Sequence, residues 1–304
     1  MATYDLKRRP AARCKTSLAF YLRPRRGLLF ATRIPEHHSA PERPDMAWKE
    51  SWQLKIRRRL RKPFNKIFHA RRYFVSQYRG ADFLLQPGWI GTLEISAKIS
   101  EYPELTNFMQ RCADLKPDIF IDIGANIGMY TCILLKNGSV PRGILFEPDR
   151  SNLIRLRANL LINGLLDLAE VYEHALSNEA GSQRFLPGKV DGGFSRIVTG
   201  DDAREAAYDV KVARLDDVLS LSGRRLAIKI DVENWECNVL AGMERTLRQN
   251  RCIVQIEAFE TRDQVIAMMA AAGYRLAANF SPILCLIKRA RRMPAKGKAR
   301  IAPA

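Results

Sequence analysis

The residues best suited to chemistry follow an apolar run in the middle of the chain. Residues 120–128 have the sequence FIDIGANIG, in which Asp122 precedes Gly124 and Gly128, and Asn126 stands between the two glycines. Glycine has no Cβ atom, so the backbone here can pass close to a ligand. The spacing differs from G-x-G-x-x-G, and Asp122 would repel a phosphate. The motif therefore argues against a nicotinamide dinucleotide site and the oxidoreductases that use one.

Asp122 has two interpretations. An acid at the end of a strand suits a cationic ligand group, such as the ammonium group of S-adenosylmethionine. In the other interpretation, residues 122–128 form a simple strand-to-helix turn, in which Asp122 or Asn126 caps the helix. The motif alone leaves both open.

A second acid, Glu147, ends the next predicted strand, about 20 residues after the glycine turn, where doubly wound folds bind ribose hydroxyls. Its carboxylate can accept hydrogen bonds from both hydroxyls. Alternatively, Glu147 caps the following helix beside Pro148 and Asp149. Acids at the ends of two successive strands favour the cofactor interpretation.

Two opposite charges stand within a strand pattern at residues 228–233, which have the sequence IKIDVE. Lys229 and Asp231 are two positions apart and face the same side of a strand. Their burial is costly unless they are paired or lie at the open end of the strand. Both are candidate catalytic residues. Asp231 either accepts a proton from an acceptor hydroxyl, lies beside a sulfonium group, or forms a structural ion pair with Lys229.

Three more polar side chains fall near predicted strand ends. Glu257 ends the segment QIE, and Glu233 ends the segment IKIDVE, so both are candidates for binding the acceptor. His174 follows the third predicted strand near the expected adenine loop and is a candidate cofactor contact. A lone histidine is more often structural, and that alternative stays open.

These residues require alternating strands and helices that bring the strand ends together. We predict strands at 119–123, 143–146, 169–175, 210–214, 226–230, 252–256, 274–280 and 283–287. We predict helices at 127–136, 151–161, 215–219, 239–247 and 264–272, and an added hairpin or active-site loop at 181–200. The pattern predicts an α/β fold, with a doubly wound, mostly parallel sheet that ends in an antiparallel C-terminal hairpin.

The motifs together resemble the FkbM family of methyltransferases over roughly residues 95–288. The matching runs are FIDIGANIGMYT (120–131), LFEPD (145–149), HALS (174–177), RLDDVL (214–219), IKIDVE (228–233) and QIE (255–257). The resemblance implies a class I methyltransferase (Rossmann-like) fold, S-adenosylmethionine as cofactor, and methylation of a hydroxyl on a small molecule, sugar, glycan or lipid-linked acceptor.

The resemblance also implies roles for single residues. The methionine pocket is formed by Asp122, Gly124, Asn126 and Gly128, the ribose is held by Glu147, and Asp231 lies beside the transferred methyl group. Two departures from the family pattern stand out. Asn234 replaces a glycine after IKIDVE, although asparagine tolerates left-handed backbone, and Trp235 adds bulk there. Residues 102–104 (YPE) match an aromatic–Glu pair imperfectly, which leaves a substrate role for Tyr102 and Glu104 in doubt.

The net charge of +18 is confined to the two ends of the chain. Residues 1–90 carry 21 Lys and Arg against 6 Asp and Glu, residues 288–304 carry 7 basic and no acidic residues, and the remainder is mildly acidic. A basic nucleic-acid groove in the central region is therefore not expected. We predict a disordered Arg/Pro-rich extension at 1–50, a basic amphipathic helical lead-in at 51–94, the methyltransferase domain at 95–288 and a disordered basic tail at 289–304.

The basic lead-in leaves a second function open. Its apolar and basic residues suit either a helix that lies on an anionic membrane surface or one that packs on the domain. A catalytically silent, methyltransferase-like scaffold or peripheral membrane protein is accordingly the alternative to the enzyme. No apolar run approaches the roughly 18 residues that span a bilayer. The six cysteines show no C-x-x-C spacing, which indicates reduced thiols and no metal site. We expect a cytoplasmic location, with the inner membrane surface as the open alternative.

Overall fold

The computed structural model describes residues 73–86, 95, 102–188, 195–198 and 207–288. The predictions for the extension 1–50, for the basic stretch 51–72 and for the tail 289–304 lie outside the described residues and stay untested. Among the helices described, none is both long and apolar enough to cross a membrane.

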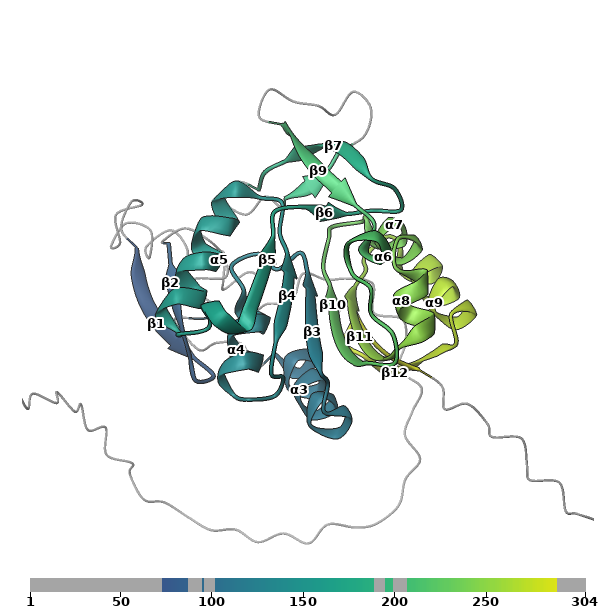
Figure 1. Ribbon diagram of the computed structural model, residues 1–304, viewed down its shortest axis with the longest axis horizontal. Coiled ribbons are helices and arrows are strands. Elements are labelled where there is room, and N and C mark those ends of the chain that lie inside the picture. Colours follow the sequence, from purple (N-terminus) through teal and green to yellow (C-terminus); the bar gives the residue numbers. More distant parts are fainter. Residues whose placement is uncertain (1–72, 87–94, 96–101, 189–194, 199–206, 289–304) are drawn as a thin grey trace, which may run out of the picture. The chain divides into compact units, whose positions relative to one another are not determined.

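A seven-stranded sheet forms the centre of the described chain, with the strand order β12-β13-β11-β10-β3-β4-β5 (Figure 1). Its strands are β3 (Ile119–Ile123), β4 (Gly143–Phe146), β5 (Ala169–Tyr172), β10 (Arg225–Ile230), β11 (Arg251–Glu257), β12 (Tyr274–Asn279) and β13 (Ile283–Lys288). Neighbouring strands from β5 to β11 pair in parallel, whereas β13 pairs antiparallel with both β11 and β12. The predicted class I methyltransferase fold, with its antiparallel C-terminal hairpin, is confirmed.

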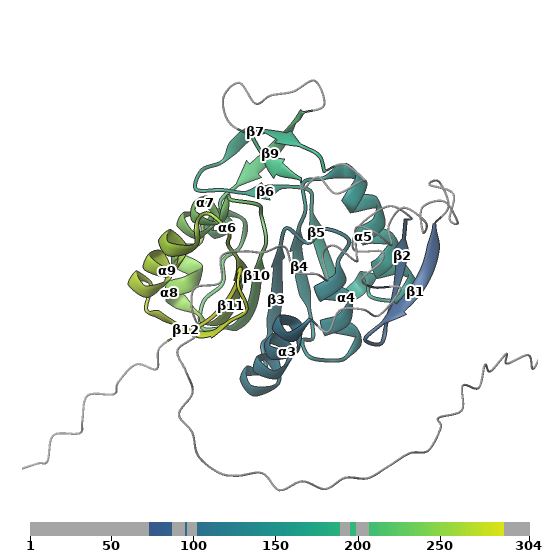
Figure 2. The ribbon, with the colours of Figure 1, turned by 180° about the vertical axis from the view of Figure 1, so that it is seen from behind.

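Alternation along the strands sends side chains into two cores, one on each face of the sheet. Phe120 packs into one core with residues of α3 (Pro103–Leu115), α4 (Met129–Lys136) and α5 (Arg150–Ile162). Ile121 packs into the other core with residues of α6 (Leu215–Val218), α7 (Glu236–Ala241), α8 (Glu244–Gln249) and α9 (Arg262–Ala271). Figure 2 shows the two groups of helices on opposite flanks. Burial on both faces explains why the parallel strands are nearly continuous apolar runs.

The region predicted as one helix at 239–247 contains two helices, α7 and α8. The chain turns between them at Gly242, where a Cβ atom would lie 1.9 Å from the backbone oxygen of Ser177. A glycine is needed there because another backbone approaches too closely for a side chain.

Helix α3 was not predicted from the sequence.

A second, four-stranded sheet has the order β6-β9-β7-β8. It consists of β6 (Ala175–Leu176), β7 (Gly181–Leu186), β8 (Arg196–Ile197) and β9 (Tyr208–Ala213). The predicted strand 169–175 is thus two strands, β5 and β6, in different sheets. The added hairpin predicted within 181–200 is present as the antiparallel pair β7–β8.

The helical prediction for 51–94 is wrong for residues 74–85, which form an antiparallel hairpin of β1 (Phe74–Tyr78) and β2 (Ala81–Leu85). Arg79 and Gly80 both adopt positive φ (49° and 83°) in the two-residue turn, as tight hairpins require. Two asparagines hold the hairpin, because the side-chain oxygens of Asn159 in α5 and of Asn163, its C-cap, accept hydrogen bonds from the backbone of β2.

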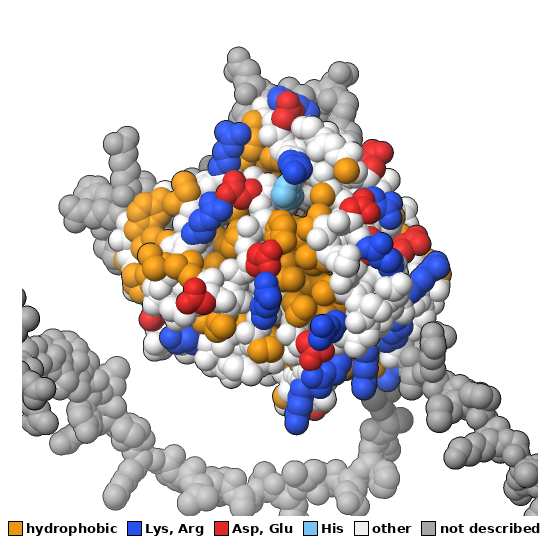
Figure 3. All heavy atoms as spheres, viewed as in Figure 1, with side chains coloured by type: hydrophobic (Ala, Val, Ile, Leu, Met, Phe, Trp, Pro, Cys, Tyr) orange, Lys and Arg blue, Asp and Glu red, His pale blue; other side chains and the backbone are white. Residues whose placement is uncertain are grey.

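Helix α5 is apolar on two sides. Its inner side packs Leu153, Leu156 and Leu160 into the core, whereas its outer side exposes Ile154 and Leu161. On the face in Figure 3, hydrophobic side chains gather on the side that carries α5 and in a band down the middle, with basic and acidic side chains among them. The apolar outer side explains why α5 lacks the one-sided pattern of an ordinary surface helix.

Candidate active site

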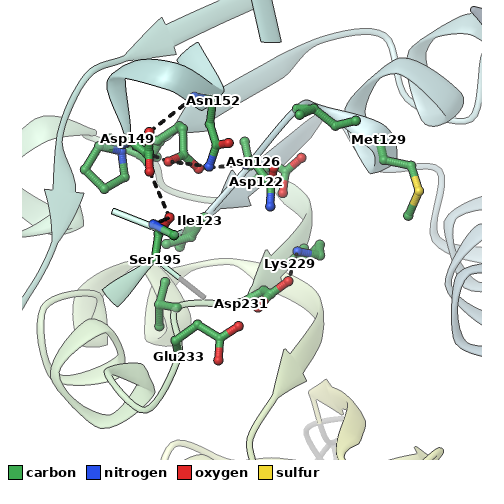
Figure 4. A pocket seen from close by; sticks show the side chains of 18 of the residues that line it. Asp122, Ile123, Asn126, Met129, Asp149, Asn152, Ser195, Lys229, Asp231 and Glu233 are labelled. Atoms are coloured by element: carbon green, nitrogen blue, oxygen red, sulfur yellow. Dashed lines mark hydrogen bonds and ion pairs between the residues drawn. The ribbon is translucent and has the colours of Figure 1, made fainter. Parts of the chain in front are cut away.

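A pocket of about 440 Å³ lies at the carboxyl ends of β3, β4, β10 and β11 (Figure 4). In doubly wound sheets, ligands bind at this edge, where the strand order reverses; here the reversal falls between β3 and β10. The pocket is lined by nearly all of the predicted site residues, namely Asp122, Gly124, Asn126, Glu147, His174, Lys229, Asp231, Glu233 and Glu257. Gly128 is the exception.

Gly128 does not line the pocket, contrary to the prediction. It precedes α4 with φ of 80°, and a Cβ atom there would lie 2.4 Å from Cδ1 of Leu156 in α5. The glycine therefore allows α4 and α5 to pack closely. Gly128 is also the N-cap of α4, with no side-chain capping bond, so the alternative that Asp122 or Asn126 caps this helix is wrong.

Asp122 is 1% exposed and has one unsatisfied oxygen. Its Oδ2 accepts a hydrogen bond from Thr131 Oγ1 at 2.7 Å, whereas Oδ1 has no partner among the described residues. Burial raises the pKa of Asp122, against the opposing effects of the Lys229 charge and the Thr131 hydrogen bond. A buried polar atom without a partner is rare, so this oxygen is the strongest sign of a ligand in the pocket.

Glu147 is also buried, and both of its carboxylate oxygens accept hydrogen bonds from backbone amides. Its Oε2 accepts from the amide of Asn126 at 2.7 Å, and its Oε1 accepts from the amide of Asp149 at 2.8 Å. Burial raises the pKa of Glu147 to about 7. The N-cap of α5 is Asp149, which accepts from the backbone of Ser151, so the alternative in which Glu147 caps this helix is wrong. Oε1 also accepts from Asn152 Nδ2 at 3.5 Å, so Oε2 is the oxygen that keeps room for a further donor.

His174 lies in the lining beside two aromatic rings. Phe146 stacks on Tyr172 at 5.0 Å between centroids, and Tyr172 lies 6.1 Å from the His174 ring. Burial lowers the pKa of His174, and its buried Nδ1 has no described partner. The structure thus places the His174 ring at the wall of the pocket.

A row of polar side chains crosses three strands. Asp122 of β3 pairs in register with Lys229 of β10, which pairs with Gln255 of β11. Gln255 was not predicted as a site residue, although a polar residue inside a buried apolar strand is a usable signal. Its Nε2 donates to Tyr130 Oη at 2.7 Å, and the Tyr130 ring lies 5.2 Å from Lys229 Nζ. Lys229 is thereby enclosed at the centre of the site.

The ion pair that the sequence left open is present. Lys229 Nζ lies 2.9 Å from Asp231 Oδ2, with the side chains 10% and 29% exposed, respectively. Burial disfavours the ammonium, yet the carboxylates of Asp231 and Asp122 raise the pKa of Lys229 above its ordinary value. Lys229 therefore remains charged between two acids.

The loop after β10 has unusual backbone. Glu233 and Asn234 adopt φ of 52° and 71°, so asparagine occupies the left-handed conformation, as expected where the family has glycine. Buried Glu236 fixes the loop, because its Oε1 accepts from the Asn234 amide at 2.9 Å and its Oε2 accepts from Thr261 Oγ1. The sequence did not single out Glu236 or Thr261.

Four further residues reach the pocket. Tyr102 and Glu104, whose role the sequence left in doubt, line it from the start of α3. Ser195 approaches from the β7–β8 hairpin, and its Oγ donates to Asp149 Oδ2 at 2.8 Å (Figure 4). Only the tertiary fold reveals this contact, because 46 residues separate the partners. Trp235 also lines the pocket.

Among the described residues, no group of three or more His, Cys, Asp and Glu side chains is arranged to hold a metal ion. The five described cysteines are free, and four of them are buried.

The family model described as the methyltransferase FkbM domain matches residues 122–276 of the chain. The hexuronic acid methyltransferase AglP of Haloferax volcanii is 27% identical over 159 residues, which cover 51% of this chain and 62% of that protein. The 31-O-demethyl-FK506 methyltransferase FkbM of Streptomyces tacrolimicus is 26% identical over 216 residues, covering 58% and 82%. The match thus spans less than two thirds of the first relative.

Two solved structures are also similar. The methyltransferase FkbM from Methylobacillus flagellatus is 21% identical with a TM-score of 0.42, covering 56% of this chain and 43% of that one. The tRNA (uracil-54, C5)-methyltransferase of Pyrococcus abyssi, in complex with S-adenosyl-L-homocysteine, is 13% identical with a TM-score of 0.41, covering 71% and 42%.

Proposed function

The chain belongs to the methyltransferase FkbM domain family, and from this premise we propose that it transfers a methyl group from S-adenosylmethionine to a hydroxyl oxygen of a small-molecule or sugar acceptor. The observation that carries the proposal is the buried, unpartnered Oδ1 atom of Asp122 in the pocket lining. Such an oxygen needs a donor, and the ammonium group of the cofactor supplies a charged one.

Two further residues fit the same cofactor. Glu147 would hold the ribose hydroxyls with its remaining acceptor capacity, because its present partners are backbone and side-chain amide groups that also fix its orientation. His174 would contact the adenine ring at the pocket wall. When bound, S-adenosylmethionine supplies a methyl group on a positively charged sulfur, which an oxygen nucleophile can take.

The names of the relatives support an oxygen acceptor. One relative is a hexuronic acid methyltransferase and the other a 31-O-demethyl-FK506 methyltransferase; the first name specifies a sugar acid and the second an O-methylated product. For this chain, the acceptor end of the pocket is the wall formed by Asp231, Glu233 and Glu257, which offers carboxyl oxygens to a hydroxyl group.

The residues of the chain position the acceptor and keep water out. Lys229 and Asp231 fix the end of β10 through their ion pair, and Trp235 and Tyr102 add bulk to the lining. When two reactants are held in line, the reaction can proceed as fast as if one of them were present at an effective concentration of about 10⁵–10⁸ M. Asn234, which stands where the family has glycine, takes the left-handed backbone of that loop.

The proposal is tested in two steps on the full chain. Isothermal titration should show saturable binding of S-adenosylmethionine and S-adenosylhomocysteine, and none of NADH. Transfer of a tritiated methyl group into glycan, lipid and small-molecule extracts should then give a base-stable ether, because a methyl ester would be hydrolysed. Binding of NADH, or cofactor binding without any transfer, would reject the proposed function.

A further inference from the structure

Three acids line the pocket on the side of β10 and β11, and they differ in how they are engaged. Asp231 forms the ion pair with Lys229. The carboxyl groups of Glu233 and Glu257 have no hydrogen bond or ion pair to any described residue, although both residues line the same pocket. Figure 4 shows Asp231 and Glu233 following one another along the same side of the pocket.

Asp231 is poorly suited to accept a proton. Protonation of its carboxylate would break the ion pair with Lys229 and leave a buried ammonium beside Asp122 alone. Removing one partner of a buried pair is strongly unfavourable, because the other charge stays uncompensated. The ion pair therefore holds the Asp231 carboxylate in place, which favours a supporting role.

The carboxyl group of Glu233, in contrast to that of Asp231, is not engaged in an ion pair with a described residue. The backbone of Glu233 and that of Asn234 are both left-handed, and buried Glu236 ties the loop to Thr261 at the start of α9. Consecutive non-glycine residues in this conformation are costly and cluster at functional sites, where the surrounding structure imposes them. The loop thus holds an unpartnered carboxyl at the wall of the pocket.

We propose that Glu233 is the general base that takes the proton of the acceptor hydroxyl, with Glu257 as its neighbour at the acceptor and with Lys229–Asp231 as a positioning pair. This role rests on the proposed function. As the acceptor oxygen bonds to the methyl carbon, the carbon–sulfur bond breaks with its electron pair left on sulfur. The hydroxyl proton passes to a carboxylate oxygen of Glu233 and from there to solvent.

The charges that face Glu233 agree with this role. Burial, and then the carboxylates of Asp231, Glu257 and Glu236, raise its pKa to about 8, against the opposing Lys229 charge. Burial, and then Asp231, Glu104 and Glu236, raise the pKa of Glu257 to about 7, again against Lys229. A base is most effective when its pKa lies near the working pH.

The kinetic arm of the test compares the full chain with Glu233→Gln, Glu233→Asp and the control Glu260→Gln, which changes an exposed acid outside the pocket lining. All four should bind S-adenosylhomocysteine alike. With the acceptor found in the extract screen, Glu233→Gln should lower kcat by about 10²–10⁴-fold and abolish the rise of kcat towards pH 8, while Glu233→Asp keeps part of that rise. An unchanged pH profile in Glu233→Gln would overturn the proposal.

The second arm needs no acceptor and so separates this inference from the proposed function. In the full chain labelled with ¹³C at the Glu side-chain carboxyl and saturated with S-adenosylhomocysteine, the resonance missing from Glu233→Gln should titrate near pH 8. Its midpoint should fall in Glu257→Gln, which removes a neighbouring acid. A midpoint near the ordinary glutamate value would overturn the role of Glu233, whatever the outcome of the transfer screen.

Discussion

Gly124 and Asp231 meet backbone to backbone. A Cβ atom on residue 124 would lie 1.9 Å from the backbone oxygen of Asp231, and φ of Gly124 is 75°. The glycine turn after β3 therefore makes room for the backbone at the end of β10. This contact brings the cofactor side and the acceptor side of the pocket together.

Gly124→Ala should consequently cost more stability than the left-handed backbone alone explains. An alanine must adopt an unfavourable φ, at about 1–2 kcal/mol, and must also push the Asp231 carbonyl away. Gly138→Ala is the matched control, because Gly138 has φ of 66° and open space around its Cβ position. Urea denaturation should show a clearly larger loss for Gly124→Ala; equal losses in the two variants would contradict the steric account.

Asp122→Asn should weaken cofactor binding while the fold persists. The substitution keeps the shape and the neighbouring Thr131, but it removes the negative charge from the buried Oδ1 position. A hydrogen bond to a charged group contributes about 1.5–3 kcal/mol, which corresponds to roughly a 10–100-fold loss in affinity for S-adenosylhomocysteine. Calorimetry on Asp118→Asn, which alters an acid just before the opposite end of β3, should show unchanged affinity. Wild-type affinity in Asp122→Asn would contradict the assignment.

Lys229→Met should destabilise the protein most at high pH. It leaves Asp122 and Asp231 as uncompensated neighbours, at about 3 kcal/mol for a buried pair that loses one partner. Protonation of the acids relieves this repulsion, so the loss of folding stability caused by Lys229→Met should become smaller as the pH falls towards 5. Denaturation curves at pH 5 and pH 8 measure the difference, and adding Asp231→Asn to Lys229→Met should recover part of the loss. A pH-independent loss would argue against the ion pair as its cause.

Much of this site could be predicted from the sequence because it lies at strand ends. The apolar runs of β3 and β4 are bounded by turn residues, so their limits matched, and Asp122 and Glu147 followed directly. The β1–β2 hairpin was missed because the basic residues preceding it suggested a helix. Asparagines in α5 and at its C-cap, far along the chain, hold the hairpin. Gly128 was assigned to the ligand because the sequence does not reveal that Leu156 packs against it.

The stability of the protein should reveal the raised pKa of Glu233. A carboxyl with a pKa of about 8 in the folded state and an ordinary value when unfolded contributes stability that is fully present below about pH 4.5. That contribution is lost as the pH rises through about 8. Glu233→Gln has no titrating carboxyl at this position and does not lose this stability. Its free energy of unfolding should therefore equal that of the parent at pH 4.5. Above pH 8 it should exceed that of the parent by about 2 kcal/mol, after allowance for partial solvent screening. Parallel stability curves for the two proteins would contradict this.

The carboxyl-lined wall should disfavour acceptors that carry their own negative charge. Asp231, Glu233 and Glu257 face the pocket there, and Lys229 is already paired. Like charges brought together at low dielectric are costly, so the uronate form of an acceptor sugar should have a KM at least about 10-fold above that of its neutral form. Glu257→Gln should narrow this difference. Equal KM values for the two forms would show that the wall does not select by charge.

A crystal structure of the chain with S-adenosylhomocysteine would show whether the acids at the ends of β3 and β4 hold the nucleoside. We expect the ligand amino group within about 3 Å of Asp122 Oδ1 and the ribose hydroxyls on Glu147. A ligand bound in this pocket with its amino group and ribose away from both carboxyls would contradict this expectation.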